Sequence, residues 1–150
     1  MQIPDKIESV EQGGKLIYKL QTVFDAQPED VWKKISSVNE IKSWDSMIME
    51  IDGAIKEGGR IALRSSISPE QKFKLKISNV VPNRQMTWSS GMYPLFRGVR
   101  QYKLNKKGEG TELVVEEVFD GWLLRLMKNK LPDCHTLFGT YARDLRRALC

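Results

Sequence analysis

Two oppositely charged side chains face each other in the best alignment of the last two strand-like segments. Segments 96–105 and 111–119 alternate apolar and polar residues and are joined by a short glycine-containing loop, which is typical of a β-hairpin. A register that gathers the large apolar residues on one face pairs Leu104 with Leu113, Tyr102 with Val115, Arg100 with Glu117 and Gly98 with Phe119. A buried charge is unfavourable unless it is paired. We therefore expect Arg100 and Glu117 to neutralise each other across the strands.

The Arg100–Glu117 pair has two interpretations. In the first it is a structural ion pair that stabilises the inner face of the sheet. In the second Arg100 anchors a ligand carboxylate or phosphate while Glu117 orients it, because a guanidinium group matches planar oxyanions. Glu117 is then also a candidate general base, and Tyr102 a second hydrogen-bonding group. The sequence leaves both interpretations open.

His135 is the only histidine of the chain. With no second histidine and with scattered acidic residues, we expect no metal site, and no motif calls for a cofactor. Cys134 is adjacent to His135 on a predicted helix, so the two side chains point in different directions and do not form a nucleophilic cysteine–histidine pair. His135 is a candidate for proton transfer, with a surface or packing role as the alternative.

The net charge of +5 is compatible with a solvated surface. Lys72, Lys74 and Lys76 alternate with apolar residues and are expected to form one exposed strand face. No aromatic residues interleave with them on that face, and a stacking platform for bases needs such residues. Nucleic acid is therefore not an expected partner. The loop Gly108-Glu109-Gly110 lies in a hairpin and lacks the strand–loop–helix context of phosphate-binding loops.

The length of 150 residues suits a single domain, 1–150, that begins with a polar lead-in at 1–14. No apolar run approaches the roughly 20 residues of a membrane-spanning helix, and the N-terminus lacks the apolar core of a secretory signal. Cys134 and Cys150 fall 16 positions apart in one predicted helix, too far along its axis to form a disulfide. Free thiols predict a cytoplasmic location.

The order of the expected elements predicts how these side chains are positioned. A strand at 16–24 is followed by a short helix that begins at Pro28 and by a second at 38–44. Short turns then separate the strands 47–51, 60–67, 72–81, 85–90, 96–105 and 111–119, which indicates an antiparallel meander. A helical segment at 122–130, an interruption at 131–133 and an amphipathic helix from Asp133 to the end complete the chain.

In this order the chain resembles the START-like superfamily, also called SRPBCC or the polyketide cyclase/dehydratase and lipid-transport group. The resemblance covers about residues 15–150. It rests on Pro28-Glu29-Asp30-Val31-Trp32, Trp44-Asp45, Pro82, Met86-Thr87-Trp88, Gly98, Tyr102, Leu104, Gly108-Glu109-Gly110-Thr111, Leu113, Glu117, Phe119 and Gly121.

The resemblance implies an α+β helix-grip fold. In this fold a curved seven-stranded antiparallel sheet wraps around a long C-terminal helix, two short helices follow the first strand, and a cavity separates the sheet from the long helix. Members include lipid carriers, hormone receptors, aromatic-polyketide cyclases and chaperone co-activators, so the fold implies a cavity and not a reaction.

We expect the cavity to bind a hydrophobic or amphipathic small molecule that is lipid- or polyketide-like. Arg100 and Glu117 would be its polar anchor, and mostly apolar walls are typical of such sites. The expected lining is Phe73, Leu75, Met86, Trp88, Tyr102, Phe119, Phe138 and Tyr141. Trp32 and Trp44 are expected in the core, and Trp122 near the entrance.

Two other functions stay open. The first is a cyclase- or dehydratase-type enzyme that uses the same cavity, with Glu117, Tyr102 or His135 transferring protons. The second is a protein-interaction module, such as a chaperone or ribosome partner, whose contact surface would be the lysine face of segment 72–76.

Overall fold

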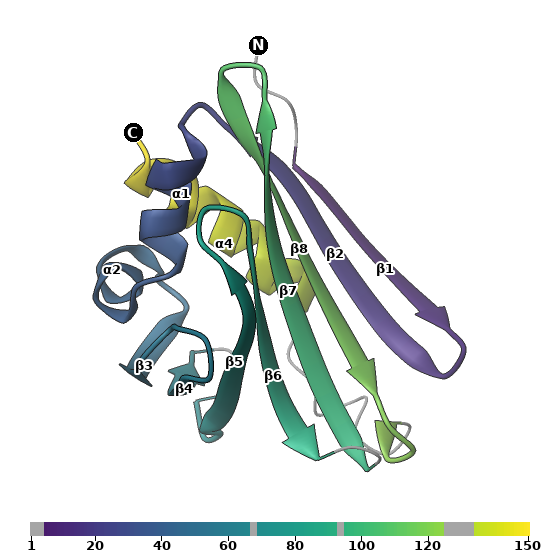
Figure 1. Cartoon of the computed structure of the whole chain (residues 1–150). Coiled ribbons are helices and arrows are strands. Elements are labelled where there is room, and N and C mark those ends of the chain that lie inside the picture. Colours follow the sequence, from purple (N-terminus) through teal and green to yellow (C-terminus); the bar gives the residue numbers. More distant parts are fainter. Residues whose placement is uncertain (1–4, 67–68, 93–94, 125–133) are drawn as a thin grey trace.

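An eight-stranded antiparallel sheet and a helix that crosses one of its faces dominate the computed structural model, which describes residues 5–66, 69–92, 95–124 and 134–150 (Figure 1). The strand order is β1-β2-β8-β7-β6-β5-β4-β3. The strands are β1 (Lys6–Gln12), β2 (Lys15–Phe24), β3 (Ile48–Gly53), β4 (Arg60–Ser65), β5 (Phe73–Val81), β6 (Gln85–Met92), β7 (Phe96–Lys107) and β8 (Gly110–Asp120). The described helices are α1 (Pro28–Ile35), α2 (Val38–Trp44) and α4 (Cys134–Ala148). No helix among the described residues is long and apolar enough to cross a membrane.

The predicted α+β architecture is confirmed, but the predicted number of seven strands is wrong. The extra strand, β1, lies within the expected polar lead-in and pairs with β2 along the edge of the sheet. All of its side chains except Ile7 are exposed, so it has no apolar alternation to reveal it. Gly13 and Gly14 both have positive φ angles, as a two-residue hairpin turn requires. Backbone pairing through this turn therefore forms β1, and the two short helices follow the second strand.

The helices α1 and α2 form for the local reasons that the sequence indicates. Pro28 occupies the first turn of α1 with two acidic residues, and lysines occupy its last turn, which suits the helix dipole. The side chain of Ser37 accepts a hydrogen bond from the backbone N–H of Glu40 and caps α2. The indole N–H of Trp44 donates to the carbonyl of Lys34 at 2.9 Å and joins the two helices. This contact sets where the segment after α2 meets the sheet.

The helix α4 covers the inner face of the sheet with one apolar stripe. Phe138, Tyr141, Ala142 and Leu145 are buried and recur at helical spacing, as predicted for this segment. The predicted helical segment 122–130 lies outside the described residues from position 125 on, as does its interruption at 131–133.

The end of α4 is joined to the N-terminal strands by Arg146. Its guanidinium group forms an ion pair with Asp5 at 3.0 Å, donates to Thr22 and to the carbonyl of Val23, and lies over the ring of Phe24. The hydroxyl of Thr22 also donates to Asp5. Together these contacts orient α4 across the sheet and so position the residues that α4 presents to it.

Packing of the α4 stripe is expected to dominate stability. Replacing the fully buried Leu145 with Ala should lower the free energy of unfolding by about 2–5 kcal/mol, because it removes buried methyl groups and leaves a cavity. Urea denaturation measures the change. The exposed neighbour Arg147→Ala should stay within about 0.5 kcal/mol, and equal effects of the two substitutions would contradict this packing.

Candidate functional site

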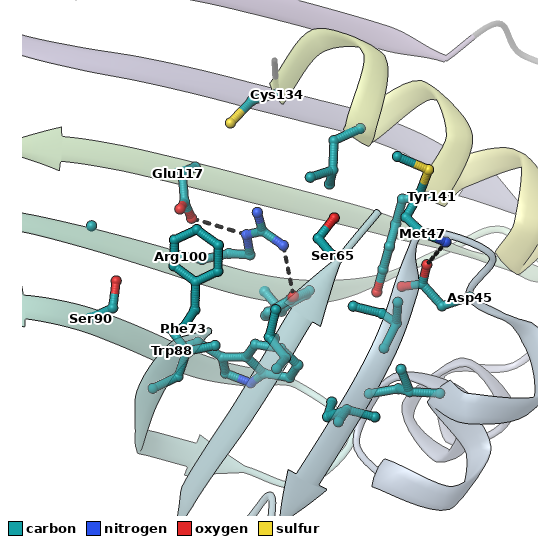
Figure 2. A pocket seen from close by; sticks show the side chains of 18 of the residues that line it. Asp45, Met47, Ser65, Phe73, Trp88, Ser90, Arg100, Glu117, Cys134 and Tyr141 are labelled. Carbon is teal, nitrogen blue, oxygen red and sulfur yellow. Dashed lines mark hydrogen bonds and ion pairs between the residues drawn. The ribbon is translucent and has the colours of Figure 1, made fainter. Parts of the chain in front are cut away.

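A pocket of about 130 Å³ lies between the inner face of the sheet and α4 (Figure 2). Strands β3 to β8 supply one wall, α4 supplies another, and α2 with the loop that follows it closes one end. The lining residues are Ile41, Asp45, Met47, Ile48, Ile51, Leu63, Ser65, Phe73, Leu75, Trp88, Ser90, Phe96, Gly98, Arg100, Tyr102, Glu117, Phe119, Cys134, Leu137 and Tyr141. Most are apolar, which is typical of small-molecule sites.

Arg100 and Glu117 form the predicted ion pair on this lining. The register of β7 against β8 is the predicted one and places the two residues opposite each other. The Nε of Arg100 donates to a carboxylate oxygen of Glu117 at 2.9 Å, and the side chains keep only 20% and 13% of their exposure. Burial is the largest single influence on the pKa of Arg100 and lowers it, but Glu117 together with Tyr102 and Cys134 outweighs burial, so that the pKa lies well above its usual value. The guanidinium therefore stays charged within the pocket.

Two further contacts hold the guanidinium of Arg100 in place. Its Nη1 donates to the hydroxyl of Tyr102 at 3.4 Å, and the group lies 5.3 Å from the ring centre of Phe138. Its other terminal nitrogen, Nη2, makes no hydrogen bond to any described residue. Arg100 is thus held in one orientation, with Nη2 unpaired within the described residues.

Four aromatic rings pack in series from the middle of the pocket, and three of them, Trp88, Tyr102 and Tyr141, belong to its lining. Trp88 contacts Tyr102 at 5.1 Å between ring centres, Tyr102 contacts Tyr141 at 6.4 Å, and Tyr141 contacts Trp44 at 5.2 Å. Burial raises the pKa of Tyr102 and raises that of Tyr141 still further. Both phenols are therefore neutral at physiological pH and are able to donate hydrogen bonds.

The sequence-predicted lining residues fall into two groups. Eight of them lie on the pocket wall: Phe73, Leu75, Trp88, Arg100, Tyr102, Glu117, Phe119 and Tyr141. Met86 and Phe138 are buried but are not among the lining residues. Met86 accepts a hydrogen bond from the indole N–H of Trp88 through its sulfur, and Phe138 supports Arg100 from α4. Both residues therefore contact the lining from behind.

The other candidates lie away from the pocket wall. His135 is exposed at the start of α4 and does not line the pocket. Trp122 is 67% exposed, whereas Trp32 and Trp44 pack against the core as predicted. Lys72, Lys74 and Lys76 are exposed, as their alternation predicts. Among the described residues, no three metal-binding side chains gather into a possible ion site.

Asp45 is a lining residue that the sequence gives no reason to select. It follows α2 in a loop, and its Oδ1 accepts a hydrogen bond from the backbone N–H of Met47 at 3.0 Å. The buried Asp144 of α4 holds the same loop by accepting hydrogen bonds from the backbone N–H and the hydroxyl of Ser46. Figure 2 shows Asp45 beside Met47 and Tyr141, at the other end of the site from Glu117. The Asp45 side chain points into the pocket because α4 holds the loop in this position.

Burial raises the pKa of Asp45 from 3.8 to about 6. The hydrogen bond from Met47 and the charge of Arg100 oppose the rise, while the charge of Asp144 adds to it. The folded protein binds this proton more tightly than the unfolded chain, so ionisation of Asp45 destabilises the fold.

Neutralising Asp45 should therefore stabilise the protein at neutral pH. The free energy of unfolding of the wild type should fall as pH rises from about 4 to 6. Once Asp45 is fully ionised, the total decrease should be at most about 3 kcal/mol. Asp45→Asn keeps an acceptor for Met47 and should raise the free energy of unfolding at pH 7.5, with no gain left near pH 4. Urea denaturation at both pH values measures this. Asp52→Asn is the control because that side chain is 74% exposed, and a gain for Asp45→Asn that is the same at both pH values would contradict the account.

Breaking the Arg100–Glu117 pair from one side should be more harmful than removing both charges. Arg100→Met leaves Glu117 without its partner and should lower the free energy of unfolding by roughly 3 kcal/mol. Arg100→Met/Glu117→Met removes both charges and should recover part of that loss. Chemical denaturation of both variants tests this, and a double variant less stable than the single one would show that the pair does not act by mutual neutralisation.

Several solved structures resemble the whole chain. Protein Ms6760 from Mycobacterium smegmatis superposes with a TM-score of 0.72 at 12% identity, covering 98% of each chain. CalU16 from Micromonospora echinospora gives a TM-score of 0.66 at 18% identity, covering 95% of this chain and 87% of that one. Ara h 8.0201 gives 0.60 at 12% identity, covering 88% and 98%. At these identities the likeness shows a shared fold.

A match to a protein family identifies the family of this chain. No curated protein matches the chain, but the family described as "Polyketide cyclase / dehydrase and lipid transport" matches residues 17–134. That range includes most of β2, all of β3 to β8 and both short helices, and with them most of the pocket wall. The START-like resemblance read from the sequence is thereby confirmed, and the chain belongs to the polyketide cyclase/dehydrase and lipid-transport family.

Proposed function

We propose that this protein binds a hydrophobic or amphipathic small molecule, lipid- or polyketide-like in character, in the pocket between its sheet and α4. The observation that carries the proposal is a mostly apolar pocket with a charged pair, Arg100 and Glu117, on its wall. Membership of a family named for cyclisation and lipid transport supports the same conclusion. The free thiols Cys134 and Cys150 suit the reducing cytoplasm in which we propose that it acts.

The volume of the pocket and the charge of Arg100 limit which ligands fit. An engineered protein cavity of about 150 Å³ holds benzene, so a pocket of about 130 Å³ suits one ring or a short branched chain. Nη2 of Arg100 is the available donor nitrogen, and a guanidinium favours a carboxylate or another planar oxyanion. A longer apolar tail would have to extend beyond the pocket.

A second candidate function is proton-transfer catalysis of the cyclase or dehydratase kind. The observation that favours it is the pKa of Asp45, about 6, which is close to the pH at which a general acid or base works best. Glu117 and Tyr102 stay candidates because they share the pocket with Asp45, whereas the exposed His135 is a weaker one. If the protein turns over a substrate, the pH profile of the rate should show a group with a pKa near 6. Asp45→Asn should remove that group from the profile.

A role in protein interaction remains an alternative that uses a different surface. Arg60, Lys74, Lys76 and Arg97 line a separate groove on the sheet, and an acidic partner would complement it. Reversing the charges of Lys72, Lys74 and Lys76 should weaken any such complex without changing ligand binding in the pocket.

Binding of benzoate, followed by NMR, tests the main proposal. Benzoate combines one ring with a planar oxyanion, so it should shift the resonances of the Trp88 indole N–H and the Arg100 Nε–H. The indole N–H of the exposed Trp122 is the internal control and should not move. If millimolar benzoate leaves the Trp88 and Arg100 signals unchanged, the proposed pocket and its anchor are wrong.

A further inference from the structure

The pocket has a second polar group of side chains, away from Arg100 and Glu117, whose hydrogen bonding is incomplete. Tyr141 is only 8% exposed, and within the described residues no hydrogen bond reaches its hydroxyl. The Oδ1 of Asp45 accepts from Met47, but no described residue donates to its Oδ2. Neither atom is among the fully buried side-chain atoms that lack a partner, and both residues line the pocket. Both atoms are therefore open to the pocket, where a ligand is able to supply the missing hydrogen bonds.

Both groups are held in place by contacts behind them. The ring of Tyr141 packs edge-on against Trp44 at 5.2 Å and tilted against Tyr102 at 6.4 Å. The loop that carries Asp45 is held to α4 by the hydrogen bonds between Ser46 and Asp144. Figure 2 shows Tyr141 extending from α4 toward the Asp45 carboxylate. Groups held in this way bind a ligand without first losing side-chain freedom.

Within the described part of the chain, no cation forms an ion pair with Asp45. Asp144 on α4 carries a like charge, and Tyr102 on β7 and Tyr141 on α4 are neutral phenols. The charge of Arg100 on β7 does act on Asp45, but Arg100 is already paired with Glu117. Near pH 7.5 Asp45 is ionised, because its pKa is about 6, so its Oδ2 is an acceptor that needs a donor.

We propose that Asp45 and Tyr141 bind a hydroxyl group of the ligand, which makes the ligand class a small hydroxylated aromatic acid. The ligand hydroxyl donates to Oδ2 of Asp45 and accepts from the hydroxyl of Tyr141, so one group satisfies both residues. The acid group binds Nη2 of Arg100, and the ring lies against Trp88 and Tyr102. This inference rests on the proposed function, because it assumes that the pocket holds the ligand.

An ammonium group is the competing chemistry at this end of the pocket. It would neutralise Asp45, but it has no lone pair to accept a hydrogen bond, so the proton of the Tyr141 hydroxyl would stay unpaired. A methoxy group has the opposite defect, since it accepts from Tyr141 but donates nothing to Asp45. These differences allow a matched series of ligands to separate the alternatives.

Calorimetric titration at pH 7.5 with substituted benzoates tests the inference. The series is benzoate, 3- and 4-hydroxybenzoate, their methoxy counterparts and 4-(aminomethyl)benzoate. The better hydroxybenzoate should bind about 10-fold or more tightly than benzoate, as expected for a hydrogen bond to a charged acceptor. The matching methoxybenzoate should lose this advantage.

Two conservative substitutions assign the advantage to residues. Asp45→Asn and Tyr141→Phe should each reduce the ratio of hydroxybenzoate to benzoate affinity to about 3-fold or less. Asp52→Asn, an exposed carboxylate on β3, should keep the wild-type ratio. Circular dichroism and thermal melting of each variant establish that it is folded.

Every outcome of this series decides one of the two proposals. If benzoate binds but the hydroxyl brings no advantage, or if both variants keep the advantage, the hydroxyl site is wrong and the proposed function stands. If the ammonium ligand binds most tightly, Asp45 is a cation site and the inference is overturned. If no member of the series binds at millimolar concentration, the proposed pocket function fails and this inference fails with it.

Discussion

The pairing of Arg100 with Glu117 across β7 and β8 is the constraint on which the rest of the pocket depends. A guanidinium on the inner face of a sheet needs a carboxylate opposite it, and only one register of the two strands supplies that partner while burying the apolar residues. Tyr102 lies beside Arg100 because the two residues are two positions apart on one face of β7. The register also sets Phe119 opposite Gly98, where a larger residue would crowd the Phe119 ring. A polar group and an apolar wall therefore arise from one strand alignment.

Asp45 differs from this pair because no cation among the described residues forms an ion pair with it. The fold places a carboxylate where burial raises its pKa and where the neighbouring Asp144 adds repulsion. Such an arrangement destabilises the protein at neutral pH, and unfavourable groups of this kind gather where ligands bind or protons move. The two ends of the pocket thus differ: Arg100 is paired with a carboxylate of the protein, whereas within the described residues Asp45 is not paired with a cation.

The sequence predicted the features that arise from the alternation of apolar and polar residues along the strands. It did not predict those that arise from tertiary contacts. The register of β7 and β8 and the inward direction of Trp88 and Phe73 follow from a period of two residues, so they were predictable. The strand β1 was missed because edge pairing, and not apolar patterning, forms it. Met86 and Phe138 point inward as predicted, yet they lie behind Trp88 and Arg100. Asp45 enters the pocket through a loop that α4 positions, and no periodicity encodes such a direction.

The most direct test of the central claim is the mass of the protein purified from cells, measured under native and then denaturing conditions. The account predicts a reproducible added mass in the native state that is lost on denaturation. It also predicts that this mass is absent from the folded Arg100→Met/Glu117→Met variant, which lacks the polar anchor. Wild-type protein without any added mass, or an added mass that the double variant retains in full, would contradict the claim that this pocket and its anchor hold a small amphipathic molecule.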